Sequence, residues 1–143
     1  MSNILYIVVP CYNEQEVLPE TSKRLREKVQ TLRQSGKIDA DSRILFVNDG
    51  SKDATWEMIQ KLHEENYVFS GVNLSRNRGH QNALLAGIAV AVEHADMIVS
   101  MDADLQDDVD AMDRMIDAYE AGNDIVYGVR SSRQKDTFFK RNT

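Results

Sequence analysis

The sequence has 143 residues, a formal net charge of -6 at pH 7, 42% hydrophobic residues and 28% charged residues. This length fits one domain with a substantial core, and the acidic balance argues against a generic nucleic-acid binder, which needs a basic surface for phosphate contacts. The single cysteine, Cys11, excludes an internal disulfide and suits a reducing compartment. There is no apolar run as long as a membrane span and no signal peptide, so we expect a soluble, cytoplasmic chain.

Apolar runs alternate with helical patterns along the chain. The first run, 4–9, is rich in β-branched residues and is ended by Pro10, as in a buried strand. In the next segment apolar residues recur at helical spacing up to Gly36, which offers a C-terminal stop. A later helical segment, 82–94, consists largely of small apolar residues that allow close packing on a sheet. Together the patterns predict strands at 4–9, 43–48, 67–74, 97–101 and 124–128, and helices at 17–35, 53–65, 82–94 and 110–121.

Five strands that alternate with helices predict parallel βαβ units, in an α/β fold whose sheet is covered by helices on both faces. Ligands of such sheets bind in the crevice outside the carboxyl ends of the strands. Polar loops follow four of the predicted strands, at 12–14, 49–51, 76–81 and 102–106. These loops would therefore meet at one edge of the sheet and form a single site.

The densest run of carboxylates, 101–108, follows the fourth predicted strand. Within it, Asp102 and Asp104 are two residues apart, and extended residues at this spacing point to the same side. Both carboxylates could bind one Mg²⁺ or Mn²⁺, because these ions prefer hard oxygen ligands and often bind one or two carboxylates plus substrate phosphates. We therefore hypothesise a metal–diphosphate site.

Other interpretations of the acidic run have to be weighed. Two aspartates at this spacing also occur by chance, and carboxylates are favoured at a helix N-terminus by the helix dipole. We assign that helix-start role to Asp107, Asp108 and Asp110. A calcium loop of the EF-hand type is excluded, because its register would put Asp107 where glycine is needed and Asp113 where glutamate is needed.

The first two polar loops each allow a structural and a functional interpretation. The ring of Tyr12 could stack on a nucleobase or lie partly buried in the core. Asp49 could accept hydrogen bonds from a nucleobase or a ribose, or belong only to a turn in which Gly50 allows a positive φ and Ser51 caps the next helix. Cys11 has no evident base partner and is interpreted as a small packing residue.

The loop after the third predicted strand is polar and basic. Arg76, Arg78 and His80 could contact a diphosphate or an anionic acceptor, aided by the amides that open the next helix, or form a solvated loop. For His80 both alternatives stay open. The chain has no glycine-rich loop of the Walker type and no GxGxxG after the first strand, which disfavours a P-loop kinase and an ordinary dinucleotide oxidoreductase.

Four segments together resemble family 2 glycosyltransferases in their order and spacing: 9–14 (VPCYNE), 47–53 (VNDGSKD), 77–84 (NRGHQNAL) and 101–106 (MDADLQ). The resemblance extends over nearly the whole chain. Within the family it is strongest to the branch that makes polyprenyl-phosphate sugars, such as dolichol-phosphate mannose synthase and bactoprenol glucosyltransferase. That finer likeness depends on 79–81, 104–106 and the tail motif 127–133.

The resemblance implies a GT-A fold, with a mostly parallel sheet flanked by helices, and gives roles to the matching positions. The nucleotide-sugar would be held by Pro10, Tyr12, Asn13, Glu14, Asp49, Gly50, Ser51, Asn77, Gly79, Asp102 and Ala103. The ion, Mg²⁺ or Mn²⁺, would be bound by Asp102, Asp104 and Gln106. The catalytic residues would be Asp102, Asp104 and Arg130, with Arg130 and Arg133 near the diphosphate or the acceptor phosphate.

The implied reaction is inverting, metal-dependent transfer of a sugar from a UDP- or GDP-sugar to a polyprenyl phosphate. A phosphate acceptor is already an anion and needs no strong general base, whereas a hydroxyl acceptor would need one. The chain shows no further obvious carboxylate–histidine pair after the fifth predicted strand, which favours the phosphate. The alternatives are transfer to a saccharide hydroxyl in surface polysaccharide synthesis, and a nucleotide-sugar binding module without turnover.

We expect a nucleotide-sugar-binding GT-A domain at 1–128 and a basic tail at 129–143. The tail contains Phe138 and Phe139 among its cations, and would either continue as a helix on an anionic membrane surface or form a frayed terminus. Members of the family continue past this point, so we expect a truncated catalytic domain that lacks the acceptor and membrane-proximal region. The full-length protein would act at the cytoplasmic face of the membrane, with no nucleic-acid partner and with a homo-oligomer as one option.

Overall fold

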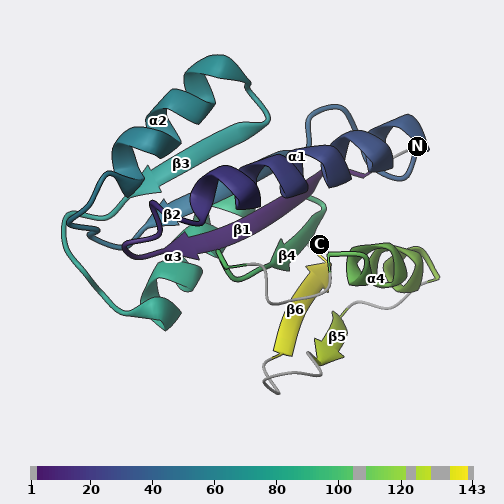
Figure 1. The fold of residues 1–143 in the computed structure, drawn as a ribbon. Coiled ribbons are helices and arrows are strands. Elements are labelled where there is room, and N and C mark those ends of the chain that lie inside the picture. Colours follow the sequence, from purple (N-terminus) through teal and green to yellow (C-terminus); the bar gives the residue numbers. More distant parts are fainter. Residues whose placement is uncertain (1–2, 105–108, 122–124, 130–135, 142–143) are drawn as a thin grey trace.

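The computed structural model describes residues 3–104, 109–121, 125–129 and 136–141. This part of the chain is an α/β fold with one six-stranded sheet and helices packed on both faces (Figure 1). The strands are β1 (Leu5–Cys11), β2 (Arg43–Asn48), β3 (Phe69–Asn73), β4 (Met97–Ser100), β5 (Ile125–Val129) and β6 (Asp136–Arg141). The helices are α1 (Leu18–Gln34), α2 (Thr55–Glu65), α3 (His80–Ala91) and α4 (Ala111–Glu120). Each strand and helix predicted from the sequence is present, with ends displaced by a few residues.

The strand order across the sheet is β3-β2-β1-β4-β6-β5. The first four of these strands pair in parallel, as the alternating pattern predicts. By contrast, β6 is antiparallel to both β4 and β5 and lies between them. The sheet is therefore mostly parallel, but the prediction that the fifth strand extends the parallel βαβ pairing is wrong, because β6 occupies the place beside β4.

The strand β6 comes from the basic tail. We expected this tail to be a helix or a frayed terminus, and for Asp136–Arg141 both expectations are wrong. The pairing joins residues far apart in the chain, such as Met97 with Arg141, so local sequence carries little sign of it. The predicted boundary at residue 128 falls inside β5, and the division into a nucleotide-sugar part and a tail stays a prediction.

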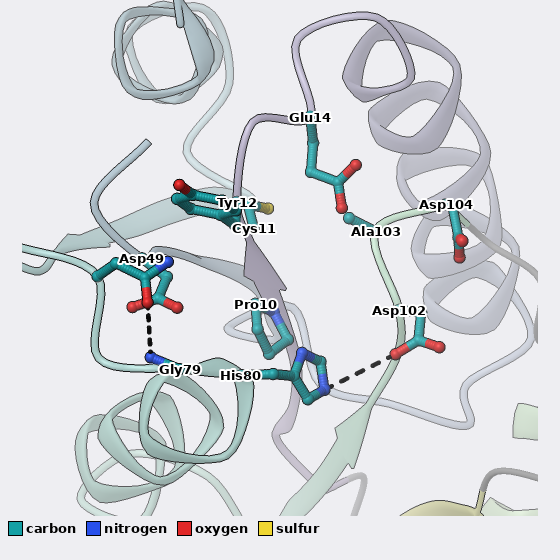
Figure 2. A pocket seen from close by; sticks show the side chains of 11 residues that line it. Pro10, Cys11, Tyr12, Glu14, Asp49, Gly79, His80, Asp102, Ala103 and Asp104 are labelled. Carbon is teal, nitrogen blue, oxygen red and sulfur yellow. Dashed lines mark hydrogen bonds and ion pairs between the residues drawn. The ribbon is translucent and has the colours of Figure 1, made fainter. Parts of the chain in front are cut away.

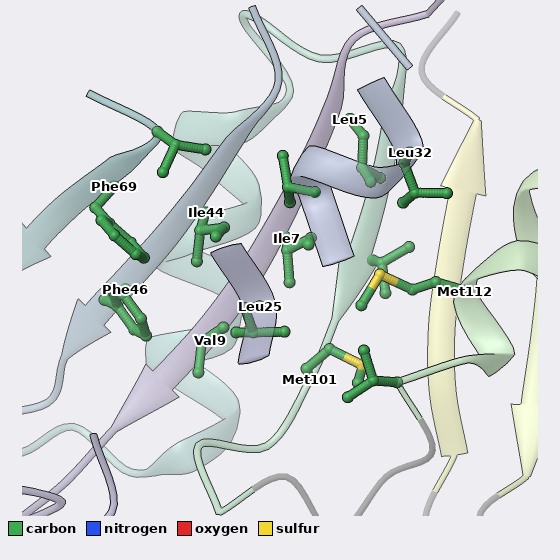
Figure 3. Close-up of a cluster of buried hydrophobic side chains, with 14 of the residues drawn as sticks. Leu5, Ile7, Val9, Leu25, Leu32, Ile44, Phe46, Phe69, Met101 and Met112 are labelled. Atoms are coloured by element: carbon green, nitrogen blue, oxygen red, sulfur yellow. The ribbon is translucent and has the colours of Figure 1, made fainter. Parts of the chain in front are cut away.

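Two apolar clusters cover the two faces of the sheet. The larger packs α1, α2 and α4 against the strands, and Figure 3 shows Leu25 of α1, Met112 of α4 and Phe46 of β2 within it. Side chains of successive residues in β1 pack on opposite faces of the sheet, since Ile7 belongs to the larger cluster and Val8 to the smaller. Burying a side chain of this size contributes roughly 1.5–3 kcal/mol, so the clusters hold the strand ends firmly in place.

The helix α3 approaches its face of the sheet very closely. A Cβ atom on Gly87 would lie 2.5 Å from Cγ1 of Val8 and 2.7 Å from Cγ2 of Val47, so this approach requires glycine. The small residues of this helix thus allow the close packing that the sequence predicts. The packing fixes the first turn of α3 beside the carboxyl ends of β1 and β2.

Strand β1 runs through Pro10, although we predicted that this proline ends it. Hydrogen bonds show which neighbour each residue faces, because Val8 O accepts from Met101 N on the β4 side and Cys11 O accepts from Asp49 N on the β2 side. Pro10 shares its side with Val8, and the β1–β4 pairing stops at Val8 and Ser100. The missing N–H of the proline therefore costs no sheet hydrogen bond.

Within the described residues, no helix has the length and apolar character that a membrane crossing requires.

Candidate functional site

An open cavity of about 250 Å³ lies at the carboxyl edge of the sheet (Figure 2). Its walls come from the ends of β1 and β2, from the loop between β3 and α3, and from the segment after β4. The four polar loops therefore meet at one site, as predicted from their positions after strands. The lining residues are Pro10, Cys11, Tyr12, Glu14, Asp49, Asn77, Gly79, His80, Asp102, Ala103 and Asp104.

The acidic corner of the cavity alternates buried and accessible residues. Met101 and Ala103 are each 3% exposed and belong to the larger apolar cluster. Asp102, which lies between them, is half-buried, and Asp104, which follows Ala103, is exposed. Both aspartates line the cavity, but Ala103 and Asp104 lie in a turn after β4, so the extended geometry that we predicted for this pair is wrong.

The acidic corner has the electrostatics that suit a cation. Glu14 lies across the cavity, where burial and the charges of Asp104 and Asp102 raise the pKa of its carboxyl group. A divalent ion bound here would offset the negative charge that disfavours ionisation of Glu14. Two hard oxygen ligands from Asp102 and Asp104 also fit Mg²⁺ or Mn²⁺, which take their other ligands from water and phosphate.

Part of the predicted metal set cannot be placed. Gln106 lies outside the described residues, as do Arg130 and Arg133 of the tail motif. Among the residues that the structure does describe, no group of three His, Cys, Asp or Glu side chains forms a complete metal site. A cation here would therefore depend on ligands beyond the carboxylates, such as a diphosphate.

Asp49 joins the cavity wall to the loops around it. The residue is 3% exposed, and its Oδ1 accepts the backbone N–H of Arg78 at 2.7 Å. Its own N–H donates to the carbonyl of Cys11 at 2.8 Å. The side chain still lines the cavity, so Asp49 ties three loops together and presents a carboxylate to a ligand. The structural and functional interpretations of Asp49 are compatible.

Hydrogen bonds between side chains and backbone groups connect the loops after β1 and β2. Ser51 Oγ accepts the N–H of Asn13 at 2.9 Å, and Asn13 Oδ1 accepts the N–H of Lys52 at 2.8 Å. Farther along, Thr55 Oγ1 accepts the N–H of Glu14 at 2.9 Å. The alternative in which Ser51 caps α2 is wrong, because its hydroxyl accepts the N–H of Asn13 and α2 begins only at Thr55.

Three predicted nucleotide-binding positions, Asn13, Gly50 and Ser51, support the cavity and do not line it. Asn13 has a φ of 52°, and Gly50 has a φ of 69°, as we expected for this glycine. A Cβ on Gly50 would lie 2.3 Å from the backbone nitrogen of Asn77, so the absence of a side chain lets the two loops touch. Asn13, Gly50 and Ser51 would therefore contribute to a ligand site only indirectly, by holding the loops in place.

Tyr12 lies at the mouth of the cavity with 43% of its surface exposed. The alternative of a partly buried core tyrosine is therefore disfavoured, because its ring is not among the members of either apolar cluster. An exposed aromatic face beside polar groups is suited to stacking on a planar ring. Tyr12 thus gives the cavity a flat apolar surface at one end.

The loop before α3 supplies the remaining wall. Asn77 Oδ1 accepts the N–H of Gly79 at 3.1 Å, and Gly79 has a φ of 93°, which turns the chain into the helix. His80 then opens α3 and lies with its Nε2 4.0 Å from Oδ1 of Asp102 (Figure 2). Arg76 and Arg78, which we considered as diphosphate contacts, are exposed and are not among the lining residues.

Two lining residues fall outside the predicted site. For His80 the sequence allows both a ligand contact and a solvated loop, and the available signal is its place in a Gly-His pair at a predicted helix start. Cys11 is predicted as a packing residue. Its thiol donates to Val9 O, and burial followed by the charge of Glu14 raises the pKa of the thiol, so Cys11 is an inert part of the wall.

Comparison with known proteins supports the likeness seen in the motifs. The model of the family "Glycosyl transferase family 2" matches residues 6–143. The chain is 51% identical over 140 residues to the uncharacterized glycosyltransferase YkoT of Bacillus subtilis, and the match covers 98% of this chain and 42% of that protein. It is 37% identical over 139 residues to the bactoprenol glucosyl transferase of Shigella phage SfV, with 96% of this chain and 42% of that protein covered.

Among solved structures, the crystal structure of TarS from S. aureus superposes with a TM-score of 0.60 at 17% identity, over 85% of this chain and 20% of that chain. This likeness supports the GT-A fold that the motifs imply. The chain spans about two-fifths of the length of YkoT and of the phage enzyme. The predicted resemblance to the bactoprenol glucosyltransferase branch is confirmed by these relatives, and the chain belongs to glycosyl transferase family 2.

Proposed function

We propose that this chain is the donor-binding part of a metal-dependent, inverting glycosyltransferase that moves a sugar from a nucleoside-diphosphate sugar to a polyprenyl phosphate. One observation supports the donor site above all others. A single cavity at the carboxyl edge brings together an exposed aromatic ring, Tyr12, and the two carboxylates of Asp102 and Asp104. This is the place where ligands of parallel α/β sheets bind.

The two ends of the cavity suit the two ends of such a donor. At one end, Tyr12 would stack on the base, and the carboxylate of Asp49 would accept a hydrogen bond from the base or the ribose. At the other end, Asp102 and Asp104 would hold Mg²⁺ or Mn²⁺ against the diphosphate, with Gln106 as a further proposed ligand. Pro10, Asn77 and Gly79 line the wall between these ends.

The chemistry requires stabilisation of the leaving group. A new bond forms between an acceptor phosphate oxygen and the anomeric carbon of the sugar, and the bond from that carbon to the donor diphosphate breaks. The electron pair leaves with the nucleoside diphosphate, and attack from the opposite face inverts the anomeric centre. A bound divalent ion would supply Lewis-acid stabilisation of the developing negative charge. In the tail, Arg130 is proposed to lie near the diphosphate or the acceptor phosphate.

The proposed acceptor is a polyprenyl phosphate for two reasons. Similar proteins include bactoprenol glucosyl transferases at 37% identity, whose name implies a polyprenyl acceptor. A phosphate acceptor also carries its own negative charge and requires no general base to remove a proton. Because such an acceptor resides in a lipid bilayer, the protein would work at a membrane surface.

A transfer assay tests this proposal. The protein is incubated with UDP- and GDP-sugars and with three acceptors in parallel: a short polyprenyl phosphate, the polyprenol that lacks the phosphate, and a saccharide. We expect product only with the polyprenyl phosphate, and only when Mn²⁺ or Mg²⁺ is present. Transfer to the saccharide alone would show the hydroxyl-acceptor alternative, and metal-dependent nucleotide binding without any transfer would show a binding module.

A further inference from the structure

A buried threonine of α1 reaches out of its own helix to the acidic corner of the cavity. Thr21 is 2% exposed, and its hydroxyl donates a hydrogen bond to the carbonyl oxygen of Ala103, which stands between Asp102 and Asp104. Threonine hydroxyls inside helices commonly bond to the carbonyl four residues earlier. Thr31 does so in the same helix, where its Oγ1 donates to Glu27 O at 3.0 Å.

This contact holds one of the two peptide groups that join the carboxylate-bearing residues, the group between Ala103 and Asp104. Ala103 is 3% exposed, so its carbonyl depends on a protein partner and loses free energy if that partner is removed. The peptide group is planar, and fixing its oxygen also fixes the direction in which the chain continues to Asp104. Upstream, the N–H of Met101 donates to Val8 O at 3.0 Å, which anchors the other side of Asp102.

The same face of α1 also holds the segment that follows. Lys28 is seven residues after Thr21, two helical turns along the same face. Its ammonium group forms an ion pair with Asp110 at 3.2 Å and another with Asp113 in the first turn of α4. Helix α1 therefore contacts the chain at Ala103 and again at the start of α4, on both sides of residues 105–108.

We propose that Thr21 is a positioning residue for the metal–diphosphate site, because its hydroxyl sets the backbone between Asp102 and Asp104. The inference rests on the proposed function, in which these two carboxylates hold a divalent ion against the donor diphosphate. Thr21 itself is buried behind the acidic corner and is not among the residues that line the cavity. Its effect on ligand binding is exerted through Ala103.

Two pairs of variants isolate the hydroxyl. Thr21→Val replaces the hydroxyl with a methyl group of similar size, and Thr21→Ser keeps a hydroxyl. Thr21→Ala serves as the partner of Thr21→Ser, since these two also differ only by the hydroxyl. The matched control is Thr31→Val, which removes a hydroxyl from the same helix at an exposed position. Binding of UDP and GDP is measured by titration calorimetry with Mn²⁺ and again with a chelator, and thermal melts report folding.

We expect Thr21→Val to weaken Mn²⁺-dependent nucleotide binding by about tenfold or more, as outer-shell partners of metal ligands commonly do. Nucleotide binding in the chelator should not change, and Thr21→Ser and Thr31→Val should bind like the unmodified chain. A purely structural role would weaken nucleotide binding equally with Mn²⁺ and in the chelator, and that result would overturn the proposal. If Thr21→Val does not fold, equal Mn²⁺-dependent binding by Thr21→Ser and Thr21→Ala would overturn it.

The same measurements distinguish a failure of the proposed function from a failure of the positioning role of Thr21. If the unmodified chain binds neither nucleotide in a Mn²⁺-dependent manner, the proposed function is contradicted, and the positioning role falls with it. If the unmodified chain binds and Thr21→Val binds within about twofold of it, only the positioning role is contradicted.

Discussion

The contact between the loops after β2 and β3 gives a sharp test of how the site is built. In Gly50→Ala, the new Cβ would lie 2.3 Å from the backbone nitrogen of Asn77 and 2.5 Å from the carbonyl carbon of Arg76. These are backbone atoms and cannot swing aside like a flexible side chain. The φ of 69° adds roughly 1–2 kcal/mol of left-handed backbone strain, and overpacking adds about 1–3 kcal/mol.

We therefore expect Gly50→Ala to lower the free energy of unfolding by about 2–5 kcal/mol, the sum of these two effects, measured by urea denaturation followed by circular dichroism. Gly36→Ala is the matched control, because Gly36 has a φ of 77° but a Cβ added there would meet no atom within 4 Å. That variant should lose only the strain of about 1–2 kcal/mol. An equal loss in both variants would refute the argument that the loop contact requires glycine at position 50.

Three further predictions concern the cavity and the helix behind it. Asp104→Asn should abolish Mn²⁺-dependent nucleotide binding in calorimetry and leave the thermal melt nearly unchanged, because this side chain is exposed; an unchanged affinity would contradict the metal role. Tyr12→Ala should weaken nucleotide binding by roughly 1–3 kcal/mol if the ring stacks on the base. Tyr67→Ala is the control and should leave binding unchanged, because it removes a ring that is 75% exposed at the far end of β3. A loss of folding in Tyr12→Ala would instead support a core role. For Lys28, burial lowers the pKa, but hydrogen bonds and charges from the carboxylates of Asp113 and Asp110 outweigh it, so the net pKa is raised above 10.5. The ion pairs of Lys28 therefore stabilise the folded protein fully at pH values below the pKa that Lys28 has in the unfolded chain, and this stabilisation is lost as pH rises through its pKa in the folded protein. A series of urea denaturations at alkaline pH should show this loss in the unmodified chain and not in Lys28→Met.

The sequence predicts most of the site because two simple rules combine. Strand and helix periods place the strand ends, and parallel topology brings those ends to one edge. Neither rule needs knowledge of side-chain contacts. Tyr12, Asp49, Asp102 and Asp104 can therefore be assigned to one cavity from the sequence alone.

The errors occur where long-range pairing decides the outcome. Nothing local in Asp136–Arg141 indicates that this segment inserts beside β4, since the partner lies about forty residues earlier in the chain. Pro10 is a similar case. A proline normally ends a central strand, but here its missing N–H faces a side on which β4 has already ended, and only the register shows this.

Supporting contacts are likewise hidden from the sequence. Helical spacing places Thr21 among the inward-facing residues of α1, but it does not reveal that the hydroxyl reaches Ala103. The Ser51 hydroxyl suggests a helix cap, whereas the tertiary structure directs it to Asn13. Short polar side chains have several possible partners, and the fold selects among them.

The central claim is that the cavity at the carboxyl edge binds a divalent ion together with a nucleoside diphosphate. Paramagnetic broadening of backbone amide signals by Mn²⁺ tests this location directly, in an isotopically labelled sample with UDP or GDP and with Mg²⁺ as the diamagnetic control. We predict that the strongest broadening, dependent on the nucleotide, affects Asp102, Ala103, Asp104 and His80, and that Thr31 on the outer side of α1 is spared. Broadening centred elsewhere, or none in the presence of nucleotide, would contradict the account.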